Sequence, residues 1–323
     1  MSLANQFKQA ARSLIDRTTG AGIGLGLAAV LVLTFLLAVP PEHAETKGPG
    51  GGVQQGTGQT SAQTIDPEGY QTVFYKNGNL NIEAYLYKPQ GNGPFPVVIY
   101  NHGSRLGSER KEVPFAYVGN MLMQNGYAVL VPERRGYGKS DGQTLSQELA
   151  GDTGAMFINR IKAEATDVAA GIEYLRTVPF ADLHRVAIMG WSLGGLVSIL
   201  AASDRNDFRA MIDQAGGSLA WKLSPALRSE LPRAARLVKA PSLCMDAEND
   251  ATTDAVRTVG QAIRDARIYE KTIIYPAFTP SSNPSNIAPG HLIFSAEGMP
   301  IWQNDVLVFL KAHMGEGSAR SPR

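Results

Sequence analysis

Short apolar runs alternate with longer segments of helical periodicity from position 96 to the end of the chain. Helices are expected at 115–125, 161–177, 193–202 and 302–313, and the apolar runs are PVVIYNHG, YAVLVPE, RVAIMG, AMIDQAG, SLCMDA and KTIIYP. Strands that alternate with helices in this way form a mostly parallel sheet with helices on both faces. The sequence therefore predicts an α/β domain whose ligands bind beyond the carboxyl ends of the strands.

The segment before these runs predicts an antiparallel hairpin at the front edge of the sheet. Leu80, Ile82 and Ala84 alternate with Asn81 and Glu83, which is the pattern of a half-buried strand. An Asn-Gly pair supplies a tight turn just before that strand.

The first 39 residues predict a signal anchor or a signal peptide. Lys8, Arg12 and Arg17 precede the predominantly apolar stretch 21–39, which is long enough to span a bilayer as a helix. Two prolines after it disfavour cleavage and favour an anchor, and either reading exports the rest of the chain. Three further segments are expected: a flexible Gly-rich linker at 40–69, the folded domain at 70–314, and a disordered tail at 315–323.

Composition argues against several function classes. The 30 basic and 29 acidic residues leave a net charge of +1, without the concentrated basic patch of a nucleic-acid partner. Cys244 is the only cysteine, so no intrachain disulfide forms and no cysteine zinc motif exists. No metal or organic cofactor is expected, and the sequence leaves the oligomeric state open.

A serine stands between two glycines where the run VAIM gives way to an apolar helix. Gly190-Trp191-Ser192-Leu193-Gly194 matches the G-x-S-x-G turn that presents a nucleophilic serine between a strand and a helix. Glycines there leave space for a strained serine backbone, and the helix N-terminus favours negative charge beside it. Ser192 is therefore the predicted nucleophile, and a plain helix cap is the alternative.

The serine needs a base to take its proton, and histidine is the expected type. His291 follows the last strand in a glycine-rich loop, and the chain order serine, acid, histidine favours it. His102 comes before the serine and His184 precedes its strand at the opposite edge of the sheet. The five histidines of the chain are His43, His102, His184, His291 and His313.

The acid that orients the imidazole should follow the run SLCM. Asp250 lies in the loop AENDAT, where its carboxylate can reach the next loop, and is the predicted triad acid. Asp246, at the strand tip, and Glu248 are the alternatives.

Two backbone amides should form the oxyanion hole. Leu193 follows the nucleophile and gives one amide, and Ser104 gives the other from the loop after the first central strand. Gly103 would let that loop approach closely, and His102 would shape it. Trp191 and His102 are the candidate residues of the substrate pocket.

Five segments together resemble the α/β-hydrolase fold, and most of all its dienelactone hydrolase and prolyl-oligopeptidase-like branch: VVIYNHGS, VLVPERRGYGKSDG, VAIMGWSLGG, APSLCMDAENDA and PGH. The resemblance implies a mostly parallel sheet, helices on both faces, an antiparallel N-terminal hairpin and no large cap domain. The family's aspartate aligns with Asp250. Two departures are that dienelactone hydrolases use a cysteine where this chain has Ser192, and that the usual aspartate after the fourth strand is Glu133.

The expected activity is cleavage of carboxylic esters with small to medium acyl chains through a Ser-His-Asp triad and an acyl-enzyme intermediate. Two alternatives stay open: an exported serine peptidase or amidase, and a catalytically inactive membrane-tethered binding protein. The expected partners are a small-molecule ester and, through the N-terminal segment, a membrane. A peptide panel and a fluorophosphonate probe would separate the alternatives, because only an activated serine reacts with the probe.

Overall fold

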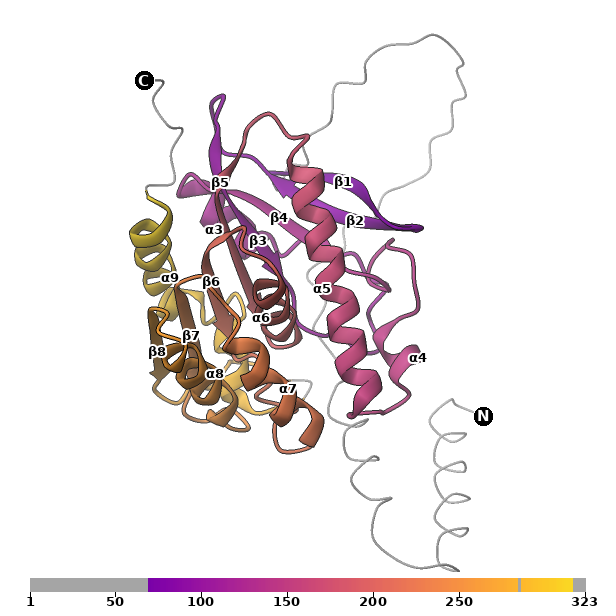
Figure 1. Cartoon of the computed structure of the whole chain (residues 1–323), viewed down its shortest axis with the longest axis vertical. Coiled ribbons are helices and arrows are strands. Elements are labelled where there is room, and N and C mark those ends of the chain that lie inside the picture. The colour runs from indigo at the N-terminus through magenta and orange to yellow at the C-terminus, as the bar shows by residue number, and fades with distance from the viewer. Residues whose placement is uncertain (1–68, 284–285, 316–323) are drawn as a thin grey trace, which may run out of the picture. The chain divides into compact units, whose positions relative to one another are not determined.

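A computed structural model of the chain describes residues 69–283 and 286–315. Eight strands form one sheet in the order β1-β2-β4-β3-β5-β6-β7-β8 (Figure 1). Their bounds are β1 Tyr70–Asn77, β2 Leu80–Tyr87, β3 Phe95–Asn101, β4 Ala128–Glu133, β5 Ala181–Trp191, β6 Phe208–Gln214, β7 Ser242–Ala247 and β8 Glu270–Tyr275.

The sheet is antiparallel at one edge and parallel elsewhere. β1 and β2 form the expected hairpin, in which Asn77 pairs with Leu80, and β2 pairs antiparallel with β4. The pairs from β4 through β3, β5, β6 and β7 to β8 are all parallel. This confirms the predicted α/β-hydrolase fold and brings the carboxyl ends of β3, β5, β6 and β7 to one edge of the sheet.

Helices cover both faces of the sheet (Figure 1). The buried side chains of α5, α6, α7 and α8 pack on one face, and those of α3, α9 and the 3₁₀ helix η1 pack on the other. Adjacent residues of β3 alternate between these two cores, because successive strand side chains point to opposite faces. The helix bounds are α3 Ala116–Gln124, α4 Leu145–Leu149, α5 Ala155–Leu175, α6 Leu193–Asp204, α7 Pro225–Ala235, α8 Asp254–Asp265, η1 Pro289–Phe294 and α9 Met299–Met314.

Three local details differ from the sequence-based expectation. α5 begins at Ala155, six residues before the predicted start at 161, because the Asp152 carboxylate accepts hydrogen bonds from the amides of Gly154 and Phe157 and caps the first turn. α8 was not predicted, although its apolar residues recur at helical spacing. His184 lies within β5 and does not precede it.

The predicted anchor at 1–39, the linker at 40–69 and the tail at 315–323 lie outside the described residues, apart from Gly69 and Gly315. None of the helices in residues 69–283 and 286–315 combines the length and apolar character that a membrane crossing requires.

Candidate active site

Ser192 occupies the turn between β5 and α6 by itself. Its backbone, with φ 58° and ψ −119°, is in a strained conformation for a residue that carries a side chain. A β-carbon at Gly190 would lie 2.2 Å from the Gly194 carbonyl oxygen, and one at Gly194 would lie 1.9 Å from the Asn101 carbonyl oxygen. Only glycine fits at these two positions. Gly190 lets α6 approach β5, and Gly194 lets α6 approach β3. Ser192 stays partly accessible at the tip of the turn.

The structure brings His291 and Asp250 together from η1 and the loop after β7. His291 Nδ1 lies 2.7 Å from Asp250 Oδ2, and Asp250 Oδ1 accepts the Ala251 amide at 2.6 Å. A β-carbon at Gly290 would lie 2.4 Å from the Asp250 nitrogen, so glycine permits this approach of the two loops. Burial alone would raise the pKa of Asp250, but the charge and hydrogen bond of His291, together with further hydrogen bonds such as that of the Ala251 amide, lower it.

The second ring nitrogen of His291, Nε2, is available to accept a proton. Nδ1 faces a carboxylate and therefore carries the proton, so Nε2 presents a lone pair in the neutral ring. Nε2 is buried and has no hydrogen-bond partner among the described residues, so no bond joins it to the Ser192 hydroxyl in this conformation. The ring lies beside the serine turn: its centroid is 5.8 Å from that of Trp191, whose Nε1 donates to the His291 carbonyl oxygen at 3.2 Å. Such catalytic contacts commonly tighten only when substrate binds.

The predicted oxyanion loop lies against the nucleophile. A β-carbon on Gly103 would lie 3.3 Å from the Ser192 β-carbon and 4.0 Å from its Oγ, so the Gly103 backbone borders the serine. Ser104 follows directly, and Leu193 opens α6, where backbone amides have no intrahelical acceptor. The two amides predicted to bind an oxyanion thus come from segments that meet at Ser192.

The buried side chain of His102 holds the loop that carries Gly103 and Ser104. Its side chain has no accessible surface, stacks on Phe115 at 5.4 Å and meets the edge of Tyr137 at 4.6 Å. Its Nδ1 donates to the Gly103 carbonyl oxygen at 2.7 Å, which holds the loop in place. In this conformation His102 therefore shapes the loop and does not face the open side of the site, whereas Trp191 is partly exposed there.

Buried charges tie the oxyanion loop to the end of β4. Arg105 binds both carboxylate oxygens of Glu133, with Nη1 to Oε1 at 3.0 Å. Arg134 donates from Nη2 to the His102 carbonyl oxygen at 2.8 Å and from Nε to Glu164 at 2.6 Å. Burial lowers the pKa of His102, and the charges of Arg134 and Arg105 lower it further, so that ring is neutral. The role of Arg105 was missed, because a single sequence does not show that an arginine is buried.

The two alternative acids have different surroundings. Glu248 is exposed. Asp246 is fully buried at the tip of β7, where its Oδ2 accepts from Ser218 Oγ at 2.7 Å. Burial raises the pKa of Asp246 to about 9, and the negative charge of Asp250 adds to the rise. The hydrogen bond from His291 Nδ1 goes to Asp250. Sequence reasoning considered Asp246 only as an alternative to Asp250 and did not predict its contact with Ser218.

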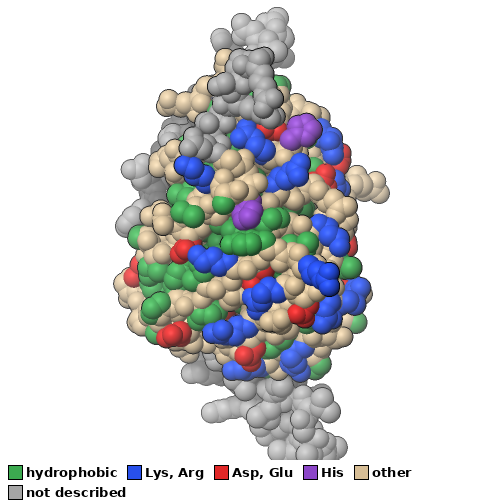
Figure 2. Space-filling model, turned by 60° about the vertical axis from the view of Figure 1, so that its left-hand side comes forward, with side chains coloured by type: hydrophobic (Ala, Val, Ile, Leu, Met, Phe, Trp, Pro, Cys, Tyr) green, Lys and Arg blue, Asp and Glu red, His purple; other side chains and the backbone are tan. Residues whose placement is uncertain are grey.

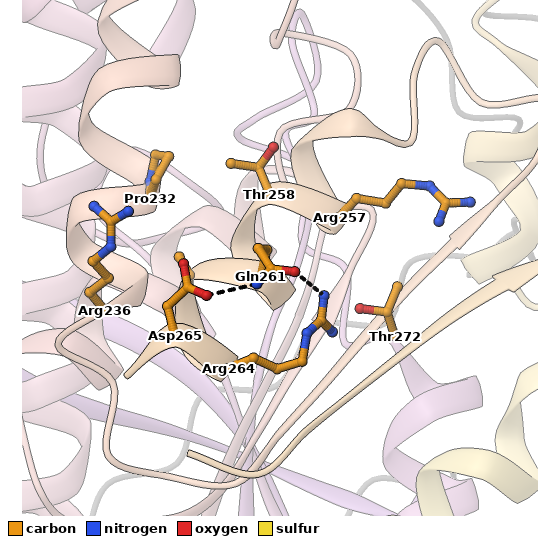
Figure 3. Close-up of a pocket in the computed structure, with 9 residues that line it drawn as sticks. Pro232, Arg236, Arg257, Thr258, Gln261, Arg264, Asp265 and Thr272 are labelled. Atoms are coloured by element: carbon orange, nitrogen blue, oxygen red, sulfur yellow. Dashed lines mark hydrogen bonds between the residues drawn. The ribbon is translucent and has the colours of Figure 1, made fainter. Parts of the chain in front are cut away.

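Two surface pockets lie away from these residues. One, of about 420 Å³, is formed by α7, α8 and β8, and a second, of about 1200 Å³, runs along β1, α3 and α9. Within the first, Gln261 donates to Asp265 at 2.7 Å and Arg264 donates to Gln261 at 3.0 Å (Figure 3). Neither pocket is lined by Ser192, Asp250 or His291. Among the residues that the structure describes, no cluster of His, Cys, Asp and Glu is arranged to hold a metal ion.

Similarity in sequence to characterised proteins covers less than half of the chain, whereas similarity in structure covers most of it. The quorum-quenching protein AidA of Acinetobacter baumannii is 30% identical over 148 residues, 46% of this chain and 44% of that protein. Human dipeptidyl peptidase 8 is 32% identical over 147 residues, 43% of this chain and 16% of that protein. The matched segment thus spans less than half the length of these relatives.

Two solved structures share the fold. The acylaminoacyl peptidase of Pyrococcus horikoshii superposes with a TM-score of 0.58 at 20% identity, over 79% of this chain and 43% of that one. An esterase of Pyrococcus furiosus superposes with a TM-score of 0.55 at 18% identity, over 84% of this chain and all of that one (100%). Residues 82–290 match the dienelactone hydrolase family, and with the α/β-hydrolase fold and the serine turn in place, the chain belongs to that family.

Proposed function

We propose that this hydrolase is a serine carboxylesterase that cleaves esters of small to medium acyl chains. The observation that carries the proposal is the His291–Asp250 hydrogen bond of 2.7 Å beside the strained Ser192 turn, with Nε2 of the histidine left without a partner among the described residues. A neutral imidazole held in this tautomer is suited to take a proton from a serine hydroxyl.

The proposed reaction proceeds in two halves. Ser192 Oγ attacks the ester carbonyl carbon while His291 Nε2 takes the hydroxyl proton, and the carbonyl oxygen becomes an oxyanion bound by the amides of Leu193 and Ser104. His291 then gives the proton to the departing alcohol and an acyl-enzyme remains. Water repeats the sequence and releases the carboxylic acid and free Ser192. Asp250 keeps the imidazole oriented and stabilises its positive form.

Labelling with a fluorophosphonate probe tests the activated serine, and an ester panel tests the substrate class. The panel contains p-nitrophenyl esters of increasing acyl length and a simple lactone, which is a cyclic ester of the kind the family name specifies. We expect probe labelling at Ser192 and the highest kcat/KM at short or medium chains. An unlabelled protein without ester turnover would instead support the inactive binding protein.

A peptidase is the second candidate. It is favoured by the sequence similarity to dipeptidyl peptidase 8 and the shared fold with an acylaminoacyl peptidase. A panel of fluorogenic dipeptide and N-acyl-aminoacyl substrates distinguishes the two candidates. The esterase proposal predicts that kcat/KM for the best ester exceeds that for every peptide, and the opposite order would identify a peptidase.

A further inference from the structure

One hydrogen bond joins the turn of the predicted nucleophile to the turn of the predicted base. The indole Nε1 of Trp191 donates to the carbonyl oxygen of His291 at 3.2 Å. Trp191 ends β5 and directly precedes Ser192, whereas His291 lies in η1, 100 positions later. Of the hydrogen bonds among the described residues, this is the only one between 190–194 and η1. It therefore connects the two segments whose side chains must meet during the reaction.

Two further aromatic donors hold the other end of η1. Trp302, from α9, donates its indole N–H to the Ile293 carbonyl oxygen at 2.9 Å. Tyr117, from α3, donates its hydroxyl to the Phe294 carbonyl oxygen at 2.8 Å. Carbonyl groups at the end of a helix lack intrahelical partners, so these donors complete the turn. They fix the end of η1 to the helices, and Trp191 acts on the part of the turn that carries the base.

The indole of Trp191 is attached to a rigid part of the sheet. Trp191 pairs with Gln214 in the parallel register of β5 and β6, and the Ser192 amide donates to the Gln214 carbonyl oxygen at 2.8 Å. Asp250 orients the His291 ring from the loop after β7 and makes no contact with β5 among the described hydrogen bonds. The indole also lies against the imidazole, with ring centroids 5.8 Å apart and planes tilted by 36°. Trp191 thus contacts both the backbone and the ring of the base.

We propose that Trp191 is a positioning residue of this active site: its indole N–H holds the His291 carbonyl and so sets the spacing between the imidazole and the Ser192 hydroxyl. The inference rests on the proposed function, because it assigns His291 and Ser192 their roles. It differs from the substrate-pocket role predicted from the sequence. A pocket residue acts by touching substrate and changes mainly KM, whereas a residue that positions the base changes kcat.

An isosteric replacement removes the donor alone. Trp191→3-benzothienylalanine, introduced by amber suppression, keeps the shape of the ring but replaces its N–H with a sulfur atom that cannot donate. Trp191→Phe removes the donor together with part of the ring. Tyr117→Phe is the matched control, because it deletes one hydrogen bond to η1 at the far end of the turn and retains the aromatic ring.

Steady-state kinetics with a p-nitrophenyl ester give the first measurement. We expect kcat of the benzothienyl variant to fall roughly three- to tenfold, as for loss of one neutral hydrogen bond, with KM unchanged within about twofold. Trp191→Phe should lose at least as much in kcat, and Tyr117→Phe should retain it. A change confined to KM would show that Trp191 only lines the pocket. Equal losses of kcat in Tyr117→Phe would show that general support of η1 matters, and either result would overturn the proposal.

Hydrogen exchange without substrate separates failure of this inference from failure of the proposed function. The His291 amide donates to the Ala288 carbonyl oxygen at 3.0 Å, and the Ser295 amide donates to that of Leu292 at 3.0 Å. In the benzothienyl variant the His291 amide should exchange roughly three- to tenfold faster, while the Ser295 amide keeps its rate. Unchanged exchange at His291 would overturn the proposal. A wild-type protein that neither cleaves esters nor reacts with a fluorophosphonate would instead reject the proposed function, and the exchange rates would still show whether the indole holds η1.

Discussion

Asp213 lies on β6 beneath the first turn of α6, with its side chain fully buried. Its Oδ1 accepts the Gly216 amide at 2.9 Å, while Oδ2 has no hydrogen-bond partner among the described residues. Burial raises the pKa of Asp213 from 3.8 to about 7. The unfolded chain therefore releases this proton at lower pH than the folded protein, and the free energy of unfolding falls as pH rises through that interval.

Asp213→Asn should remove this loss, because an asparagine oxygen can accept the same amide and the side chain stays neutral. The difference in unfolding free energy between the variant and the wild type should be small at pH 3 and grow in favour of the variant by up to about 4 kcal/mol at pH 8. Urea unfolding at several pH values measures it. The same substitution at the exposed Asp265 serves as the control, with a difference near zero throughout. A difference for Asp213→Asn that does not change with pH would contradict the prediction.

The hydroxyl of Ser192 is the proposed nucleophile, so its removal should abolish turnover. Ser192→Ala removes the attacking oxygen and leaves the turn, the histidine and the oxyanion amides in place. Turnover of a p-nitrophenyl ester should fall by about 10⁴ or more with the melting temperature unchanged. Ser203→Ala, near the end of the helix α6 that follows Ser192, is the control and should retain full activity, because the Ser203 hydroxyl only donates to a carbonyl of its own helix and to a neighbouring side chain. Retained activity in Ser192→Ala would remove this serine from the mechanism.

The loop after β3 is held in place by a buried ion pair with the end of β4. Arg105 extends from the loop to Glu133, and both side chains are almost completely buried. Glu133→Gln would leave the guanidinium buried without a counter-charge, which costs about 3 kcal/mol or more of unfolding free energy. The loop that carries Ser104 should loosen as well, so kcat should fall about tenfold or more while KM changes less.

A matched carboxylate in the same region provides the control. Glu112 also pairs with a basic side chain, Lys139, but the two side chains are 46% and 59% exposed. Exposed pairs of this kind contribute about 1 kcal/mol or less, so Glu112→Gln should change neither the urea midpoint nor kcat. If both substitutions had the same small effect, the buried pair would not be what holds the oxyanion loop.

The same elements show which features a single sequence can predict. Apolar runs predicted the central strands β3 to β7, because strands buried on both faces are largely apolar. The shorter apolar run within KTIIYP predicted the edge strand β8, which is only partly buried. The motif around Ser192 predicted a turn whose glycines the structure requires at 190 and 194. The contact between Asp246 and Ser218 was not predictable, because Ser218 lies in a separate segment after β6 and only the folded chain brings it to the end of β7. The start of α5 was misplaced because its cap, Asp152, lies outside the apolar repeat.

At the scale of the whole molecule, the sheet separates two cores and leaves a surface of mixed character. On the face shown in Figure 2, lysine and arginine side chains are interspersed with acidic and hydrophobic ones and do not form one continuous basic patch within the described part of the chain. No described helix is suited to cross a membrane. The apolar stretch 21–39, which lies outside the described residues, is the predicted membrane anchor.

We predict that this chain is an integral membrane protein through this stretch. Expressed in bacterial cells, it should stay in the membrane fraction after washes with high salt and alkaline carbonate and dissolve in detergent. Leu27→Arg combined with Leu31→Arg places two charges in the middle of the stretch, at about 2.5–3.5 kcal/mol each for insertion, and should move most of the protein to the soluble fraction. Leu27→Ile with Leu31→Ile preserves the apolar character and should behave as the wild type. Equal partitioning of the arginine and isoleucine variants would show that 21–39 does not insert as a helix.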